Sequence, residues 1–210
     1  APVGPARLTD CVFAVVDVET TGSRPANGDR ITEIAIVIVK GGSCEPVYEI
    51  VVNPERSIPR KVTALTGITQ ADVASRPRFD EIAEQVRSEL TGRIFAAHNV
   101  SFDWRFVASE MRRSLGFDLA GQRICTARLG RVLVSGLRSS SLDSLARYFG
   151  IEIQPRHRAG GDALATAKLL VRLLHLAAER GATTVDDLVR LTRRSRKRKK
   201  SAMPAPMKDV

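Results

Sequence analysis

The sequence lacks long hydrophobic runs and is poor in cysteine, and each shortage excludes a class of protein. A membrane-spanning helix needs about 20 apolar residues, whereas apolar stretches here, such as Ile34–Val39, only reach strand length. The N-terminus has no basic segment followed by an apolar one, so it does not resemble a signal peptide. Cys11, Cys44 and Cys125 form no Cys-x-x-Cys pair, which disfavours a disulfide framework and a zinc site. We therefore expect a soluble globular protein of the reducing cytoplasm, without a membrane partner.

Acidic residues are scarce at the C-terminal end, where basic residues accumulate. The net charge is +10, and residues 191–210 contribute eight basic residues and one acid, so they carry +7 and the rest of the chain carries +3 (10 − 7). A block of like charges is typical of a solvated, disordered segment, and its second interpretation is a contact with nucleic acid or another partner. We expect one domain at residues 11–193, a flexible N-terminus at 1–10 and a basic disordered tail at 194–210.

Hydrophobic periodicity predicts a mixed sheet with flanking helices. Three β-branched segments come first, and Gly41-Gly42 between the second and third favours a hairpin turn. Helical and strand patterns alternate after them. The expected strands are Cys11–Val18, Ile31–Lys40, Cys44–Val52, Arg93–Ala97 and Arg123–Thr126, and the expected helices are Phe79–Leu90, Ser101–Leu115, Leu142–Phe149, Ala163–Glu179 and Thr183–Leu191. This order predicts an α/β fold whose sheet begins as a three-stranded meander and continues with parallel strands.

Two carboxylates stand at the end of the first expected strand, in Val15-Val16-Asp17-Val18-Glu19. Alternation along a strand places Asp17 and Glu19 on the same face. Two like charges at that spacing repel each other, and burial makes each charge more costly, so a purely structural role explains the pair poorly. A divalent cation such as Mg²⁺ or Mn²⁺ prefers carboxylate oxygens and would explain it. The competing interpretation is a pair of solvated acids at a strand end.

A second group of polar residues follows the strand expected at 93–97. His98 and Asn99 lie at its end, where open sheets place their ligands, and Asp103 falls in the first turn of the next helix, after Ser101 as N-cap. An acid in the first turn also stabilises a helix through its dipole, which is a sufficient reason for Asp103 taken alone. Phe102 is compatible with a core position and with stacking on a base.

A third group, His157-Arg158-Ala159-Gly160-Gly161-Asp162, precedes the long helix expected at 163–179. The glycines favour a loop around His157 and place Asp162 near the helix start. Taken singly, Asp162 is a capping residue and His157 is a surface histidine. A loop histidine is also what a general base for water activation requires, because imidazole titrates close to neutral pH. His175, within the helix, has no such context.

The acids and the histidine occur together in an order that resembles a known family. Asp17-x-Glu19-Thr20-Thr21-Gly22, His98-Asn99-x-x-Phe102-Asp103 and His157-x-x-x-x-Asp162-Ala163 are similar to the three motifs of the DEDDh group of 3′→5′ exonucleases. Shorter matches occur at 31–35, 65–69 and 141–145. The similarity runs from about residue 13 to residue 174, and within the family it is greatest to the proofreading epsilon subunit of bacterial DNA polymerase III.

The resemblance implies a ribonuclease H-like fold and a site for two divalent cations, Mg²⁺ or Mn²⁺. Asp17 would contact both ions, and Glu19, Asp103 and Asp162 would complete their coordination. His157 would act as general base on the attacking water, and nucleoside 5′-monophosphates would leave the 3′ end of the nucleic acid. The residues expected to contact the substrate are Thr20, Thr21, Leu65, Thr66, His98, Asn99 and Phe102.

More than one function is compatible with these motifs. The preferred substrate is DNA with single-stranded or frayed 3′ ends, but an RNA exonuclease of the same chemistry has the same motifs, because discrimination rests on contacts with the 2′-hydroxyl. A non-catalytic nucleic-acid-binding module and a protein adaptor that acts through the basic tail are the two remaining hypotheses. The glutamines are not followed by the apolar-aromatic pair of a clamp-binding peptide. Association with a polymerase or clamp is therefore open, and a stand-alone nuclease is favoured.

Overall fold

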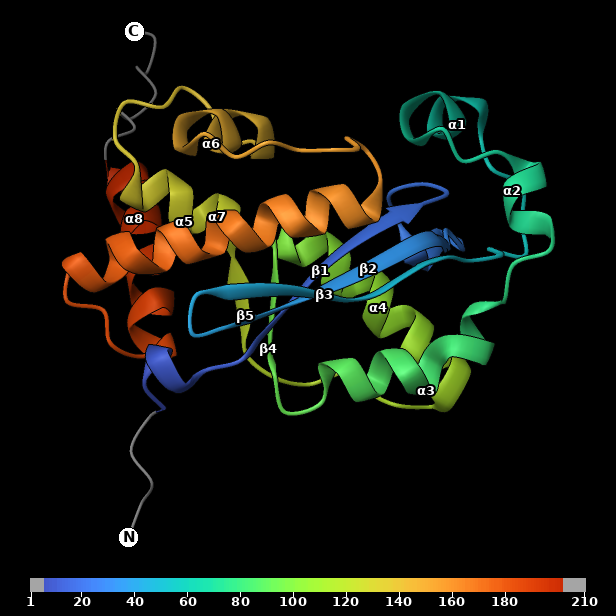
Figure 1. Cartoon of the computed structure of the whole chain (residues 1–210), viewed down its shortest axis with the longest axis horizontal. Coiled ribbons are helices and arrows are strands. Elements are labelled where there is room, and N and C mark those ends of the chain that lie inside the picture. Colours follow the sequence, from blue (N-terminus) through green and yellow to red (C-terminus); the bar gives the residue numbers. More distant parts are fainter. Residues whose placement is uncertain (1–5, 202–210) are drawn as a thin grey trace, which may run out of the picture.

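A five-stranded mixed sheet forms the centre of the chain (Figure 1). The computed structural model describes residues 6–201, with side chains described through Arg193. The strands are β1 Phe13–Thr20, β2 Ile31–Lys40, β3 Ser43–Val51, β4 Ile94–Ala97 and β5 Arg123–Cys125. Their order is β3-β2-β1-β4-β5; β1, β2 and β3 pair antiparallel, whereas β4 is parallel to β1 and β5 is parallel to β4. The expected meander followed by parallel strands is confirmed.

Helices cover both faces of this sheet. They are α1 Arg60–Thr66, α2 Gln70–Ala74, α3 Phe79–Leu90, α4 Val100–Leu115, α5 Thr126–Leu133, α6 Leu142–Phe149, α7 Ala159–Glu179 and α8 Val185–Ser201. One hydrophobic cluster joins the sheet to α3 and α4, and a second joins it to α5, α6, α7 and α8. Figure 1 shows α3 and α4 below the sheet and α5, α6 and α7 above it. None of the helices among residues 6–201 is long and apolar enough to span a bilayer.

Alternation along β1 decides which layer its acidic residues face. Phe13 and Val15 belong to the cluster on the α7 side, whereas Val16 and Val18 belong to the cluster on the α3–α4 side. With a period of two, Asp17 and Glu19 continue the row of Phe13 and Val15. The strand therefore directs both carboxylates towards the layer that contains α7.

Three helices were not expected from the sequence: α1, α2 and α5. Short helices carry too few turns to repeat an apolar stripe, and α1 buries only Thr66 among its own residues. Helix α2 is fixed instead by a capping box, in which Thr69 accepts from the N–H of Asp72 and Asp72 accepts from the N–H of Thr69. Helix α5 does bury residues at helical spacing, but two of the four are not large apolar side chains, so the pattern is weak; they are Thr126, Leu129, Gly130 and Leu133.

The boundaries at several element ends also differ from expectation. Helix α4 begins at Val100, with Asn99 rather than Ser101 before it, and α7 begins at Ala159 rather than Ala163. At the N-terminus, Leu8–Asp10 forms a 3₁₀ helix and Arg7 pairs with Thr184, so residues 6–10 are ordered rather than flexible.

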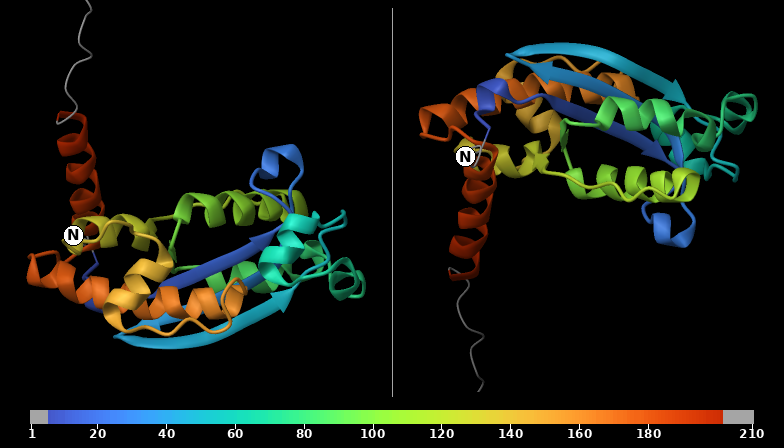
Figure 2. Two further views of the ribbon diagram at one scale, coloured as in Figure 1. Left: turned by 90° about the horizontal axis from the view of Figure 1, so that it is seen from above. Right: turned by 90° about the horizontal axis from the view of Figure 1, so that it is seen from below.

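At the C-terminal end, α8 continues to Ser201, so the expected boundary at residue 193 falls inside a helix. The part of the expected tail at 194–201 is therefore helical and not disordered. Residues 202–210 and residues 1–5 lie outside the described part of the chain. Figure 2 shows α8 projecting from the end of the molecule opposite α1.

Candidate active site

Three carboxylates converge where β1 ends and α7 begins. One ligand oxygen from each of Asp17, Glu19 and Asp162 can be chosen such that all three lie within 4.8 Å of one another. Asp17 and Glu19 come from the row of β1 that faces α7, and Asp162 comes from the first turn of that helix. The strand and the helix therefore bring together residues that are far apart in the sequence.

Asp103 adds a fourth carboxylate from α4. It lies in the first turn of that helix, as expected, and is 5% exposed. In addition to burial, the charge of Asp103 acts on Asp17 and raises the pKa of that carboxyl. All four acids predicted from the sequence thus meet at one place, where the two helical layers approach the end of β1.

Burial and mutual repulsion disfavour the charged forms of these acids. Burial raises the pKa of Asp17 well above its usual range, and the charges of Asp103 and Asp162 raise it further. Burial, with the nearby Asp162, raises the pKa of Glu19 to about 7, and burial also raises that of Asp103 to about 7. For Asp162, burial raises the pKa against the opposing charges of Arg156 and His157. Such a cluster is stable in its ionised form only with a counter-charge.

The donor set fits hard divalent cations. Oδ1 of Asp162 is buried and has no hydrogen-bond partner among the described residues, although a buried carboxylate oxygen is normally satisfied. The surrounding ligands are carboxylate oxygens, which suit Mg²⁺ and Mn²⁺, and neither sulfur nor imidazole is part of the group. These residues could therefore hold divalent cations, and their chemistry alone does not distinguish between the two metals.

Arg156 is a residue of the site that sequence reasoning missed. Its guanidinium hydrogen-bonds Asp162 and forms an ion pair with Asp143 of α6 at 2.9 Å. Its positive charge also lowers the pKa of Asp17 and Glu19, against the larger effect of burial. The one sequence signal was its position directly before the motif histidine. Arg156 partly neutralises the four acids in the absence of a cation.

An ion pair with a buried carboxylate fixes the segment that carries His157. Nε of Arg158 lies 3.0 Å from both carboxylate oxygens of Glu33, whose side chain is 1% exposed, on β2. The same carboxylate accepts from the N–H of Ala159 at 2.9 Å, which satisfies one free donor at the start of α7. Glu33 therefore ties the residue after His157 and the first turn of α7 to the sheet.

Glycines explain why α7 begins earlier than its sequence suggests. A Cβ at Gly161 would lie 2.1 Å from the carbonyl oxygen of Pro155, and a Cβ at Gly160 would lie 2.3 Å from the Glu49 carboxylate. At Gly161 the first turn of α7 packs on the backbone of the segment before it, so only glycine fits there, whereas the neighbour of Gly160 is the flexible end of the Glu49 side chain. His157 lies between these contacts in a left-handed conformation, with φ of 59°, and its Nδ1 is 3.4 Å from Arg156. The expected loop position of His157 is confirmed.

The residues expected to contact a substrate differ in how far they are buried. Thr20 and Thr21 are buried at the turn after β1, where Oγ1 of Thr21 accepts from the N–H of Arg30. Leu65 and Thr66 end α1, which stands at the end of the sheet where β1 ends (Figures 1 and 2). Leu65 is 56% exposed, an unusual exposure for a large apolar side chain.

The motif residues after β4 differ in hydrogen bonding and in exposure to solvent. Both ring nitrogens of His98 are engaged, Nδ1 with Oγ1 of Thr126 and Nε2 with the carbonyl oxygen of Ser140, each at 3.0 Å. Burial lowers the pKa of His98 to about 4, so the ring is neutral at pH 7. Asn99 is exposed, and Phe102 is half-buried with its ring centroid 5.0 Å from that of Phe106. The expected positions of His98 and Asn99 at the strand end are confirmed.

Comparison with known proteins gives consistent results for sequence and fold. The family model described as "Exonuclease" matches residues 14–170. The chain is 34% identical to the 3′-5′ exonuclease DinG of Bacillus subtilis, over 86% of this chain and 19% of that protein. It is 36% identical to a DNA polymerase III subunit epsilon-like protein of Rhodobacter capsulatus, over 84% of this chain and 26% of that protein. The chain therefore spans about a quarter or less of the length of these relatives.

Solved structures show the same architecture. Exonuclease X, in complex with 5′ overhanging duplex DNA, is 28% identical and superposes with a TM-score of 0.67, over 86% of this chain and 99% of that one. Exonuclease I of E. coli, in complex with a dT13 oligonucleotide, shares the fold with a TM-score of 0.70 at 21% identity, over 81% of this chain and 42% of that one. The expected ribonuclease H-like fold is confirmed, and the chain belongs to the exonuclease family.

Proposed function

We propose that this chain is a metal-dependent 3′→5′ exonuclease that hydrolyses phosphodiester bonds at the 3′ end of single-stranded or frayed DNA and releases nucleoside 5′-monophosphates. The observation that carries the proposal is the meeting of three carboxylates from β1 and α7, one of them with a buried oxygen, Oδ1 of Asp162, that has no hydrogen-bond partner among the described residues. Asp103 of α4 lies close enough for its charge to act on Asp17. Such a cluster is costly to build in a folded protein. Its cost is explained if two divalent cations, Mg²⁺ or Mn²⁺, bind there.

Each acid has a distinct position in this proposal. Asp17 is central, because the charges of Asp103, Asp162 and Glu19 all act on it, and we assign it as the ligand shared by both ions. Glu19, Asp103 and Asp162 would hold the cations together with Asp17. When bound, the two cations supply a water of lowered pKa and stabilise negative charge on the leaving 3′-oxygen.

His157 is the proposed general base. It lies outside any helix or strand, on the segment before α7, and the Glu33–Arg158 ion pair and Gly161 hold that segment against the sheet. Its imidazole lies beside Arg156 and close enough to Asp162 to act on its charge. From this place the ring can accept the proton of a water held by the carboxylate cluster.

Residues near the carboxylate cluster are proposed to contact the terminal nucleotide. Leu65 presents an exposed apolar side chain on which a base can pack, and Phe102 presents a half-buried ring to the same end of the sheet. Thr20 and Thr21 follow Glu19 and are buried, Thr66 is buried at the end of α1, and Asn99 offers an exposed amide. His98 belongs to the substrate side in this proposal, although both of its ring nitrogens are already hydrogen-bonded.

A digestion experiment tests the proposal. Purified protein with Mg²⁺ or Mn²⁺ should shorten a 5′-labelled single-stranded DNA oligonucleotide in single-nucleotide steps, and EDTA should stop the reaction. Matched RNA and duplex DNA in parallel reactions decide between the proposed substrate and RNA, since the metal site is the same for both. A DNA oligonucleotide that stays intact both with Mg²⁺ and with Mn²⁺ would contradict the proposal. If RNA were digested faster than DNA, the proposed substrate would be RNA instead.

A reducing cytoplasm remains the predicted compartment.

A further inference from the structure

A basic groove lies next to the carboxylate cluster and has no role in the chemistry proposed above. It is about 690 Å³ in volume and runs between the start of α4, helix α5 and helix α8. Asn99 and Ser101 line the end towards α4, and Arg123, Arg128, Arg131 and Arg193 line the rest. We call this surface the arginine groove.

The charges of the arginine groove are not compensated. No aspartate or glutamate lines it. Within residues 6–193, none of its four arginines forms an ion pair, whereas Arg30, Arg156 and Arg158 all pair with carboxylates. All four groove arginines are exposed. Four uncompensated cations that converge on one hollow repel one another, so the groove is suited to a ligand with repeated negative charge.

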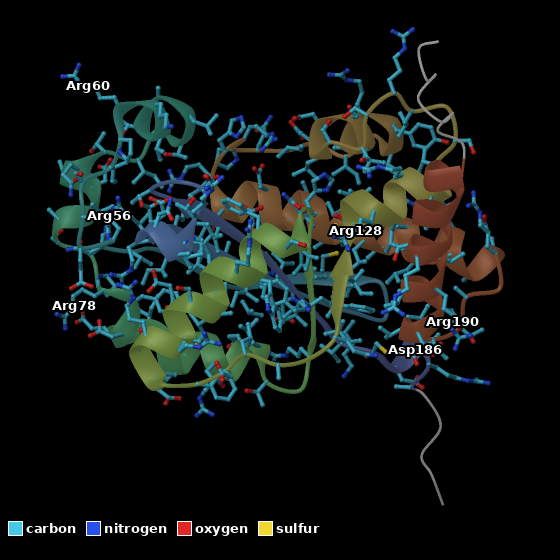
Figure 3. The ribbon with its side chains drawn as sticks, turned by 180° about the vertical axis from the view of Figure 1, so that it is seen from behind. Arg56, Arg60, Arg78, Arg128, Asp186 and Arg190 are labelled. Carbon is cyan, nitrogen blue, oxygen red and sulfur yellow. The ribbon has the colours of Figure 1, made fainter. Side chains whose placement is uncertain are left out.

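The groove arginines are held loosely, in orientations that leave their charge accessible. Arg128 lies 3.5 Å from the hydroxyl of Ser101, Arg131 hydrogen-bonds the hydroxyl of Ser140 at 3.0 Å, and Arg123 stacks 4.6 Å above the ring of Trp104. A neutral hydroxyl or an aromatic ring positions a guanidinium without neutralising it. Figure 3 shows Arg128 on the face that carries α4 and α5, with α8 beside it and Arg56, Arg60 and Arg78 at the opposite end of the molecule.

The arginine groove and the carboxylate cluster share the start of α4. Asn99 and Ser101 line its end, and Asp103 of the carboxylate cluster belongs to the same turn of α4. At the far end, α8 forms a wall through Leu188, Val189, Thr192 and Arg193. The sequence of α8 continues with six further basic residues between 194 and 200. The basic segment singled out in the sequence is thus the continuation of a helix that lines this groove.

We propose that the arginine groove binds the phosphate backbone of single-stranded DNA on the 5′ side of the terminal nucleotide. The inference rests on the proposed function, since it assumes that a DNA 3′ end lies at the carboxylate cluster. The strand is single in this proposal because the proposed substrate has a single-stranded or frayed 3′ end. Phosphates that follow the 3′ end would pass Ser101 and meet Arg128 and Arg131 in turn.

Comparison of a long and a short substrate tests the inference. The protein is assayed on a trinucleotide, which reaches only the carboxylate cluster, and on a strand of about 16 nucleotides, which also fills the groove. The variant Arg128→Gln/Arg131→Gln removes two groove charges. The control Arg113→Gln/Arg172→Gln removes two exposed charges from α4 and α7 that do not line the groove.

The groove variant should lower the ratio of kcat/KM for the long strand to kcat/KM for the trinucleotide on the order of tenfold, because two phosphate contacts are lost. Its plot of log kcat/KM against log salt for the long strand should also be less steep by about 1.4, or about 0.7 for each contact with a single strand. The control variant should keep both the ratio and the slope of the wild type. An unchanged ratio and slope in the groove variant, or an equal loss in the control, would overturn the inference.

A binding assay separates this inference from the proposed function. Fluorescence anisotropy of a labelled DNA strand without metal reports binding even if no oligonucleotide is cleaved. Weaker binding by the groove variant than by the control supports the groove in a chain that shows no exonuclease activity. Equal binding by both variants, or stronger binding of a poly-glutamate peptide than of a strand of equal charge, would contradict it.

Discussion

The carboxylate cluster and the arginine groove meet at the first turn of α4, yet they are built in opposite ways. The cluster gathers negative charges in a largely buried place and fixes them with backbone donors and neighbouring side chains. The groove gathers positive charges on exposed side chains that contact only hydroxyls and one aromatic ring. The difference corresponds to two requirements: hydrolysis needs fixed geometry, whereas retention of a polyanion needs only charge density.

The two regions also differ in how strongly the repulsion between their charges destabilises the folded chain. Repulsion between exposed arginines is weakened by water and salt. The buried acids have no such screening, and Arg156 offsets only part of their charge. We therefore expect substitutions in the cluster to change stability and activity in opposite directions, and substitutions in the groove to change only binding.

Among the substitutions considered, Asp17→Asn should cause the largest loss of activity. Activity should fall by more than the ~10²–10³-fold that removal of one charge-stabilising group usually costs, because Asp17 is the proposed ligand of both cations. The melting temperature of the metal-free protein should rise at the same time, by about 2–4 °C for each kcal/mol of repulsion relieved. Kinetics on a labelled oligonucleotide and thermal unfolding in EDTA measure the two effects. If both the activity and the melting temperature of the metal-free protein fell, repulsion between the acids would not be what destabilises the metal-free chain.

His157→Ala should affect the chemical step and not the cation site. The expected loss in kcat is about 10²–10⁴-fold, the usual contribution of a general base. The rise in melting temperature caused by Mn²⁺ should stay as in the wild type. His175→Ala, an exposed histidine on α7, is the matched control and should leave kcat unchanged. Loss of the Mn²⁺ effect in His157→Ala would show that the residue binds metal instead.

Glu33→Gln tests the ion pair that holds the His157 segment. The variant keeps the shape of the side chain but weakens the hydrogen bonds with Arg158 and Ala159, which should cost about 1.5–3 kcal/mol of stability, towards the lower end because Arg158 is 38% exposed. A misplaced His157 should lower kcat about tenfold, with little change in KM. Glu45→Gln, on the exposed edge strand β3, is the control. An equal change in kcat and KM would assign Glu33 a purely structural role.

The dependence of stability on pH should differ between the metal-free and the metal-bound protein. Glu19 and Asp103 have pKa values of about 7 in the folded metal-free chain, above their ordinary values of 4.5 and 3.8. The folded state therefore binds more protons than the unfolded chain below pH 7, so stability falls as the pH rises through about 7. Mg²⁺ at about 100 times its Kd should add about 2.7 kcal/mol above that pH. Melting temperatures measured at pH values on both sides of 7, with EDTA or with Mg²⁺, check this prediction. A melting temperature of the metal-free protein that rises as the pH passes 7 would contradict it.

Sequence patterns were most reliable where a period repeats over several turns or residues. The bounds of Ile31–Lys40, Phe79–Leu90 and Leu142–Phe149 coincide with β2, α3 and α6. The alternation in β1 was sufficient to place Asp17 and Glu19 on one face. These elements are amphipathic or fully buried, so their apolar residues record the local structure directly.

Sequence patterns failed where contacts between distant residues decide the structure. Gly160 and Gly161 were expected to precede the helix, but they lie in its first turn, and at Gly161 the backbone of Pro155 leaves no space for a Cβ. The ion pair between Glu33 and Arg158 joins two residues that are far apart in the chain and follows no periodicity. The arginine groove was not visible for the same reason, since α4, α5 and α8 contribute to it separately.

Anomalous diffraction from crystals of the protein with Mn²⁺ tests the proposed cation site most directly. We predict Mn²⁺ between Asp17, Glu19 and Asp162, with an oxygen of Asp162 as ligand at roughly 2.0–2.2 Å, the range of hard divalent ions. Arg156 should then have moved away from Asp162. Crystals in which these carboxylates bind no manganese, with Arg156 still paired to Asp162, would contradict a two-cation site at the end of β1.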